Sequence, residues 1–135
     1  MTERKFKREL NSLEGVFGFI SDVINENKIN EGIAFSINLA VEELFTNMVK
    51  YNPGKAGDIV IRLGREDNQL RVDLIDIESK PFDITKTPEV DTGKPLDDRN
   101  PGGLGIHLVK KMMDNILYDY SNGTSTITLI KNLET

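Results

Sequence analysis

The sequence predicts an α/β two-layer sandwich, in which a mixed, largely antiparallel sheet carries its helices on one face. Segments with helical periodicity come first, and segments rich in β-branched or alternating apolar residues follow. The strand-like segments come in adjacent pairs separated by turn residues, which is typical of hairpins. Hairpin strands with helices packed against one face enclose one core, so we expect a single domain over residues 1–135.

The first helix is predicted over residues 12–27. Its apolar residues recur at helical spacing: Leu13, Val16, Phe17, Ile20 and Ile24. Asn11 and Glu14 have the spacing of a capping box, in which a short polar side chain and a glutamate satisfy the first backbone N–H groups. The residues before this helix, which include Phe6 and Leu10, are compatible with a short edge strand.

The second helix is predicted from about Glu31 to Tyr51. One face of it is apolar: Ile33, Ile37, Ala40, Val41, Leu44 and Met48. The run Asn52-Pro53-Gly54 ends it, because proline cannot continue a helix and glycine turns the chain.

The second half of the chain predicts two hairpins and one more helix. Strands are expected at about 58–64, 70–76, 116–120 and 125–130, and a helix at about 104–115. Between them, residues 77–103 lack periodicity and are interrupted by proline and glycine. A loop of that length inside a compact domain is usually functional or disordered.

Composition excludes several kinds of site. The chain has no cysteine and one histidine, so disulfides and zinc sites built from thiolates or histidines are not expected. A formal net charge of −5 gives no general attraction for nucleic acid. No segment approaches the ~20 apolar residues of a membrane span, and no secretory signal opens the chain. We therefore expect a cytoplasmic protein with no direct nucleic-acid or membrane partner.

A short basic cluster lies near the N-terminus. It consists of Arg4, Lys5, Lys7 and Arg8, with Glu3 and Glu9 beside it. Because the acidic neighbours offset its charge, we interpret this cluster as a solvated edge rather than a binding patch.

Glu43 and Asn47 are the first candidates for chemistry. They are four residues apart on the second helix, so their side chains lie on one side of it, next to the apolar face. The carboxylate could orient or deprotonate a hydroxyl, and the amide oxygen could bind Mg²⁺, which prefers oxygen ligands. Lys50, about one turn further on, could reach a phosphate. The alternative is an ordinary polar flank of an amphipathic helix.

A glycine-rich turn, Pro101 to Ile106, precedes the third helix. Its spacing is G-G-x-G, which is neither the Rossmann nor the Walker pattern. Glycines there allow backbone N–H groups at a helix start to approach an anion, although a simple hinge has the same composition. His107 follows on the side away from the apolar face, and we expect it to be a surface residue.

Two further candidates lie on predicted strands. Asp76 ends the second strand of the first hairpin, where a carboxylate can accept a hydrogen bond from a ligand amine or simply form a turn. Ser125 belongs to the hydroxyl cluster that opens the last strand, together with Thr124 and Thr126.

Taken in order, these features resemble the GHKL (histidine-kinase-like) ATPase superfamily, and within it the small anti-sigma regulatory factors with serine-protein kinase activity. The segment N-L-A-V-E-E-L-F-T-N, from Asn38 to Asn47, resembles the asparagine motif of that superfamily. P-F-D, from Pro81 to Asp83, resembles the end of its adenine-side motif, and G-G-L-G-I-H-L-V-K-K-M-M-D, from Gly102 to Asp114, resembles its glycine motif. The resemblance implies a Bergerat-type ATP-binding fold.

The resemblance also implies a role for each matching residue. Glu43 is the general base and Asn47 the Mg²⁺ ligand, while Asp76 accepts the adenine amino group and Ser125 supports that contact. The other implied nucleotide-binding residues are Lys50, Arg99, Gly102, Gly103, Leu104, Gly105 and Ile106, and of these Lys50 and the residues from Gly103 to Ile106 lie near the phosphates. Residues from about 83 to 103 correspond to a mobile lid over ATP.

The loop after Asp76 departs from the family pattern. The family has Asp-x-Gly shortly before P-F-D, whereas this chain has no glycine between Asp76 and Pro81. Strand alternation favours Asp76 as the adenine carboxylate, but counting back from Pro81 leads to Ile77. We therefore expect any difference in nucleotide binding from the family to lie at this loop.

The resemblance implies an ATP- and Mg²⁺-dependent serine/threonine-protein kinase that phosphorylates an anti-anti-sigma (STAS-type) partner and sequesters a sigma factor, as a homodimer. One alternative is a non-catalytic partner-switch module of the same fold that binds nucleotide weakly or not at all. A second is the catalytic domain of a histidine kinase acting on a separate protein. A complete sensor kinase is not expected, because the sequence shows no phosphoacceptor helix before the domain.

Overall fold

The computed structural model describes residues 1–51, 57–77 and 103–133, with residues 51 and 103–105 described by their backbone alone. Its elements, in chain order, are β1 (Thr2–Phe6), a 3-10 turn (Leu10–Ser12), α1 (Leu13–Glu26), α2 (Glu31–Tyr51), β2 (Ile59–Glu66), β3 (Gln69–Ile77), α3 (Gly103–Met112), β4 (Asn115–Ser121) and β5 (Thr124–Asn132). Every predicted helix and strand is present, although the N-terminal edge strand ends at Phe6 and Leu10 lies in the 3-10 turn.

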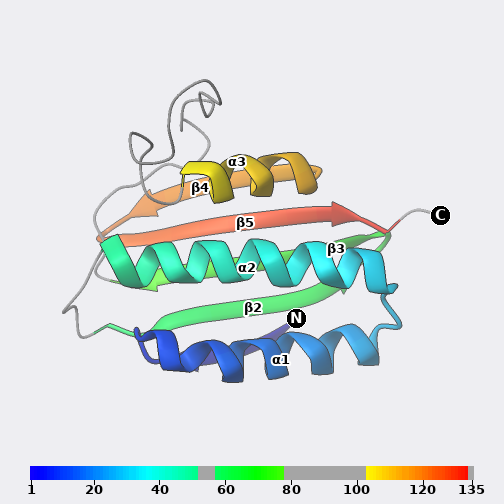
Figure 1. Cartoon of the computed structure of the whole chain (residues 1–135), viewed down its shortest axis with the longest axis horizontal. Helices are drawn as coiled ribbons and strands as arrows, with labels where there is room; N and C mark the ends of the chain where they lie inside the picture. The colour runs from blue at the N-terminus through cyan, green and yellow to red at the C-terminus, as the bar shows by residue number, and fades with distance from the viewer. Residues whose placement is uncertain (52–56, 78–102, 134–135) are drawn as a thin grey trace.

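The strands form a sheet in the order β1-β2-β3-β5-β4. All of its pairings are antiparallel, so the described sheet is more uniform than the mixed one expected. The three helices lie on the same face: α1 over the β1–β2 side, α2 over the middle of the sheet, and α3 beside β4 and β5 (Figure 1). The predicted two-layer sandwich is confirmed.

The core fills the space between the helices and the sheet. On β3 the inward residues alternate along the strand as Leu70, Val72 and Leu74, and each is fully buried. The helix residues in the same buried cluster include Val16, Phe19, Ile20, Ile37, Ala40, Val41, Leu44, Phe45, Ile106 and Val109. In α1, Phe19 and Val23 are buried and Phe17 is only half-buried, so the apolar face is rotated slightly from the predicted one.

The last hairpin shows why its turn residues are needed. Asn122 and Gly123 connect β4 to β5 with φ angles of 53° and 78°. Two successive positive φ values give the tight turn whose twist matches that of paired strands, and asparagine and glycine tolerate them best. This turn fixes the register of β5, which carries Ser125 close to its start.

The first helix starts differently from the expectation. The cap position is Ser12, and no side chain caps the helix, so the capping box of Asn11 and Glu14 is not formed. The 3-10 turn from Leu10 to Ser12 leads directly into α1, and Ser12 Oγ donates to the carbonyl of Lys7 at 2.8 Å. The Ser12 hydroxyl thus stabilises the turn that precedes α1 and does not cap the helix itself.

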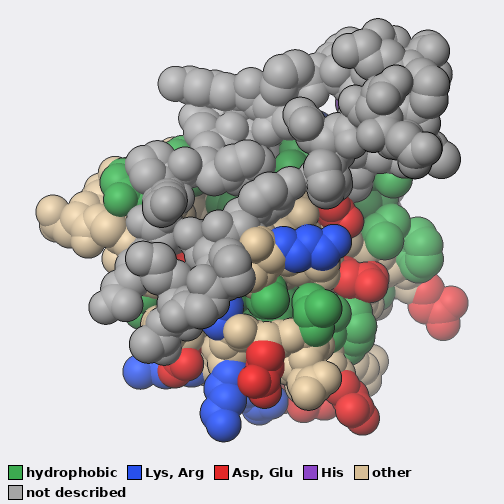
Figure 2. Space-filling model, turned by 60° about the vertical axis from the view of Figure 1, so that its left-hand side comes forward, with side chains coloured by type: hydrophobic (Ala, Val, Ile, Leu, Met, Phe, Trp, Pro, Cys, Tyr) green, Lys and Arg blue, Asp and Glu red, His purple; other side chains and the backbone are tan. Residues whose placement is uncertain are grey.

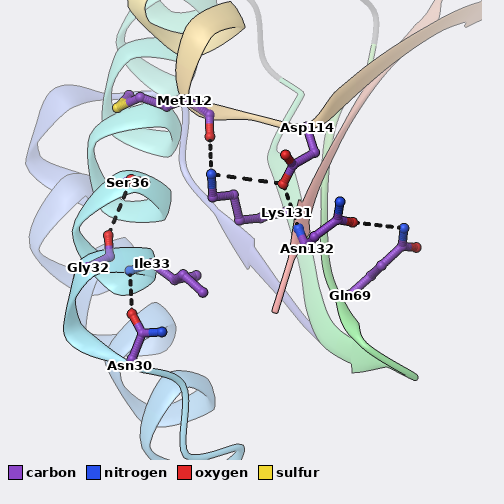
Figure 3. Close-up of polar contacts among 9 residues, drawn as sticks. All are labelled: Asn30, Gly32, Ile33, Ser36, Gln69, Met112, Asp114, Lys131 and Asn132. Atoms are coloured by element: carbon purple, nitrogen blue, oxygen red, sulfur yellow. Dashed lines mark hydrogen bonds and ion pairs between the residues drawn. The ribbon is translucent and has the colours of Figure 1, made fainter. Parts of the chain in front are cut away.

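The third helix ends at Met112, three residues before the predicted end. Lys131 Nζ donates to the Met112 carbonyl at 2.7 Å, and Asp114 accepts the backbone N–H of Asn132 at 2.7 Å (Figure 3). A cation at a helix C-terminus satisfies a carbonyl that has no partner within the helix. Contacts with β5 therefore end the helix where the local sequence does not. None of the helices described is long and apolar enough to span a bilayer.

Candidate functional site

The elements that carry the predicted site residues converge at one end of the sandwich. The C-terminal end of α2, the end of β3, and the starts of α3 and β5 all lie on the left in Figure 1. Figure 2 turns this end forward and shows acidic and basic side chains next to one another, with apolar side chains beside them. Residues far apart in sequence are thereby brought to the same end of the molecule.

Glu43 and Asn47 occupy neighbouring turns of α2. Glu43 is half-buried, Asn47 is 6% exposed, and Lys50 is exposed in the last helical turn. Burial raises the pKa of the Glu43 carboxyl above its ordinary value of 4.5, and the charge of Glu42 adds to this, while Lys50 and Asn47 lower it. A carboxyl whose pKa is raised is better matched to accept a proton near neutral pH.

Asn47 has a buried polar atom without a partner. Its Nδ2 is near enough to Glu43 to lower the pKa of that carboxyl, but it makes no hydrogen bond of normal geometry within the described part of the chain. A buried donor left unpaired costs roughly 1–3 kcal/mol, so such groups are rare unless a ligand or water completes them. Rotation about the last side-chain bond exchanges the amide nitrogen and oxygen, and Asn47 can therefore offer either group.

Asn47 is suited to bind Mg²⁺ together with phosphates and water, and not as part of a metal site built from protein side chains alone. The described residues contain no group of three or more acidic or histidine side chains that would hold an ion by themselves. Mg²⁺ is typically held by one or two protein oxygens together with phosphates and water. Asn47 would supply one such oxygen.

Asp76 and Ser125 are direct partners across β3 and β5. They are 3% and 5% exposed, and both lie on the sheet face that the helices cover. Ser125 Oγ lies 3.4 Å from the hydroxyl of Tyr118 on β4. Ile77 is 38% exposed, so strand alternation turns Asp76, and not Ile77, toward the helices.

Arg8 was not predicted as a site residue, and its assignment to a solvated edge is wrong. Its side chain is 3% exposed and forms an ion pair with Asp76 Oδ1, whose side chain is 4% exposed. The guanidinium also donates to the carbonyls of Met48, at 3.4 Å, and Ile77, at 3.2 Å. No sequence signal marks Arg8, because β1 ends at Phe6 and the strand alternation does not extend to residue 8.

The other members of the predicted basic cluster remain near the surface. Arg4 is exposed, and its guanidinium carbon lies 5.1 Å from the ring centroid of Phe19. Only the last residue of the cluster turns into the molecule.

The glycine motif forms the first turn of α3. Gly103 starts the helix, and Leu104 and Gly105 follow within it, so their backbone N–H groups belong to a helix N-terminus. The Ile106 side chain is 2% exposed and belongs to the core, and His107 is half-buried. Arg99, Gly102, the P-F-D motif and the predicted lid up to residue 102 lie outside the described residues.

Comparison with known proteins gives a consistent result. Residues 6–131 match the family model described as the histidine kinase-like ATPase domain. The serine-protein kinase RsbW of Bacillus subtilis is 31% identical over 104 residues, and the match covers 72% of this chain and 63% of that protein. The serine/threonine-protein kinase BtrW of Bordetella bronchiseptica is 25% identical over 99 residues, covering 72% and 69%. The chain thus spans less than two thirds of the RsbW relative.

Solved structures agree on the fold. The RsbU and RsbW domains of Rv1364c from Mycobacterium tuberculosis match with a TM-score of 0.71 at 15% identity, covering 98% of this chain and 32% of that one. The SiaB–SiaC complex from Pseudomonas aeruginosa matches with a TM-score of 0.63 at 12% identity, covering 97% and 89%. At these sequence identities the structural similarity shows that the folds agree, and no more than that.

Proposed function

This chain belongs to the histidine kinase-like ATPase family, as its sequence motifs had indicated, and we propose that it is an ATP-dependent serine/threonine-protein kinase of the partner-switching kind. The observation that carries the proposal is the pair formed by Glu43 and Asn47. A half-buried carboxyl with a raised pKa and a buried amide with an unpaired nitrogen lie one helical turn apart in the C-terminal half of α2. The names of RsbW and BtrW, both protein kinases, support the same class of activity.

In the proposed reaction, a serine hydroxyl of the partner attacks the γ-phosphorus of ATP. A bond forms between the serine oxygen and phosphorus as the bond from phosphorus to the ADP oxygen breaks, and Glu43 takes the serine proton. Asn47 and the N–H groups at the start of α3 position the phosphates, with Lys50 and Arg99 near them. Mg²⁺, when bound, neutralises charge on the phosphates. Asp76 and Ser125 are the polar groups that face the adenine.

The proposed phosphoacceptor is a STAS-type anti-anti-sigma protein, and a sigma factor is the second partner, bound by a homodimer. This part of the proposal rests on the resemblance of the sequence motifs to the anti-sigma regulatory factors with serine-protein kinase activity. Incubation with labelled Mg-ATP and a STAS-domain protein encoded near this one in the genome tests it. Absence of transfer, when calorimetry shows that both ATP and the STAS protein bind, rules out the kinase.

Glu43→Gln is the decisive variant. Loss of a general base lowers the rate of such a transfer by about 10²–10⁴-fold, while the nucleotide still binds. Glu42→Gln, on an exposed neighbouring position of the same helix, is the matched control and retains transfer. A Glu43→Gln protein with full transfer activity contradicts the assigned role.

A second function is favoured by a specific observation. Arg8 already engages the carboxylate assigned to adenine, which suits a binding module that switches partners with little or no nucleotide. Titration of wild type with Mg-ATP separates the two proposals, because the module predicts no measurable heat of binding.

A further inference from the structure

Arg8 and the base of ATP require the same oxygen atoms. The guanidinium of Arg8 donates to Asp76 Oδ1. The 6-amino group of adenine is also an N–H donor, and Asp76 is the carboxylate assigned to it. The two side chains of the ion pair are 3% and 4% exposed, so in this arrangement the carboxylate is closed to a ligand from solvent.

Contacts from three places hold Arg8 in this position. Besides Asp76, its donors meet the carbonyl of Met48 in the last turns of α2 and that of Ile77 at the end of β3. A cation at the C-terminal end of a helix is favourable, because the last carbonyls lack partners within the helix. The N-terminal segment is thereby tied to the helix that carries Asn47 and to the strand that carries Asp76.

One atom of Arg8 is less well placed. Nε is buried and makes no hydrogen bond within the described residues. A guanidinium has five N–H donors, and an unpaired buried donor is costly. The buried position of Arg8 therefore combines a strong ion pair with one unsatisfied donor. If Arg8 moves so that Nε reaches water, the hydrogen bond gained by Nε offsets part of the free energy lost with the ion pair.

We propose that Arg8 determines base specificity at this site by competing with the 6-amino group of adenine for Asp76. The inference rests on the proposed nucleotide site. Wild type discriminates poorly between ATP and inosine triphosphate, in which an oxygen replaces the amino group, because Asp76 is engaged by Arg8 in both cases. Without the guanidinium, the amino group of ATP can donate to the carboxylate, whereas the 6-oxygen of inosine triphosphate is an acceptor and cannot.

The test is calorimetric titration of wild type and Arg8→Met with Mg-ATP and with Mg-inosine triphosphate. Methionine keeps an unbranched apolar stem and removes every donor. The expected result is that Arg8→Met binds ATP about tenfold more tightly than wild type, as gained by one charge-assisted hydrogen bond, and binds inosine triphosphate no more tightly. The inference is supported equally if Arg8→Met binds ATP and wild type shows no measurable ATP binding.

Two outcomes overturn it. Equal or weaker ATP binding by folded Arg8→Met means that Arg8 orients Asp76 instead of competing for it, and equal tightening for both nucleotides means that the 6-amino group is not involved. If wild type and variant both fail to bind either nucleotide, the proposed function itself is wrong, and the inference falls with it. Arg8→Gln, which keeps an uncharged donor, gives a smaller change in the same direction and replaces Arg8→Met should that variant not fold.

Discussion

The proposed base side and the proposed phosphate side of the candidate site differ in how their polar groups are satisfied. On the base side, Asp76 pairs with Arg8, and Ser125 lies next to the hydroxyl of Tyr118. On the phosphate side, the buried amide nitrogen of Asn47 has no partner among the described residues, and burial raises the pKa of Glu43. At the proposed site, a ligand would complete the phosphate side, whereas on the base side it would compete with Arg8 for Asp76, and this difference predicts opposite effects of mutation.

The largest expected effect is on stability, from breaking the buried ion pair. Arg8→Met or Asp76→Leu alone leaves a buried charge without its partner, which costs about 3–5 kcal/mol of unfolding free energy. The double variant removes both charges and recovers most of that loss, since a well-packed apolar pair can replace a buried ion pair. Denaturant unfolding of the four proteins measures the coupling.

The exposed pair between Arg62 and Glu3 is the matched control for this cycle. Its side chains are 47% and 50% exposed, and its atoms lie 2.8 Å apart. Exposed pairs contribute about 0–1 kcal/mol, so Arg62→Met changes the unfolding free energy little. Similar losses for Arg8→Met and Arg62→Met would show that the base side is not held by its ion pair.

A smaller effect of opposite sign is expected on the phosphate side. Asn47→Leu removes an unpaired buried donor with little change of shape, so the unfolding free energy stays equal or rises by about 1 kcal/mol, while Mg²⁺-dependent ATP binding is lost. Asn27→Leu is the control, because Asn27 Nδ2 donates to the Val23 carbonyl at 2.9 Å at the end of α1. The control loses stability and keeps ATP binding.

A loss of stability in Asn47→Leu comparable with that in Asn27→Leu would mean that the Asn47 amide is already satisfied. The phosphate side would then resemble the base side, and the contrast between them would disappear. Chemical denaturation and nucleotide titration on the same samples distinguish these outcomes.

The sequence predicted best the features that depend on neighbouring residues, such as the bounds of a helix with a clear apolar face. The bounds of α2 agree with the prediction because its apolar periodicity and the proline after it act within one turn of the chain. The end of α3 was missed because Lys131, which caps Met112, is 19 residues away. Arg8 was missed for the same reason, since its partner is 68 residues away and sequence spacing does not relate them.

The candidate site divides in the same way. Glu43 and Asn47 could be recognised together because a helix fixes the relation between residues four apart. Asp76 and Ser125 needed the register of β3 on β5, which depends on a pairing between distant segments. Sequence motifs supplied these two residues, but only the tertiary structure shows that the carboxylate is already engaged.

The smallest effects concern the titration of Glu43, and they test whether its surroundings are as described. Because burial raises its pKa, the stability that this group contributes is complete below pH 4.5, its ordinary value, and is lost as pH rises through the pKa in the folded protein. Glu43→Gln therefore gains stability over wild type as pH rises toward neutrality. Two neighbours act on the same carboxyl in opposite directions: Glu42→Gln lowers the pKa of Glu43 and Lys50→Met raises it. Carbon NMR titration of the Glu43 carboxyl in the three proteins measures both shifts, and shifts of the same sign would mean that one of these charges does not face Glu43.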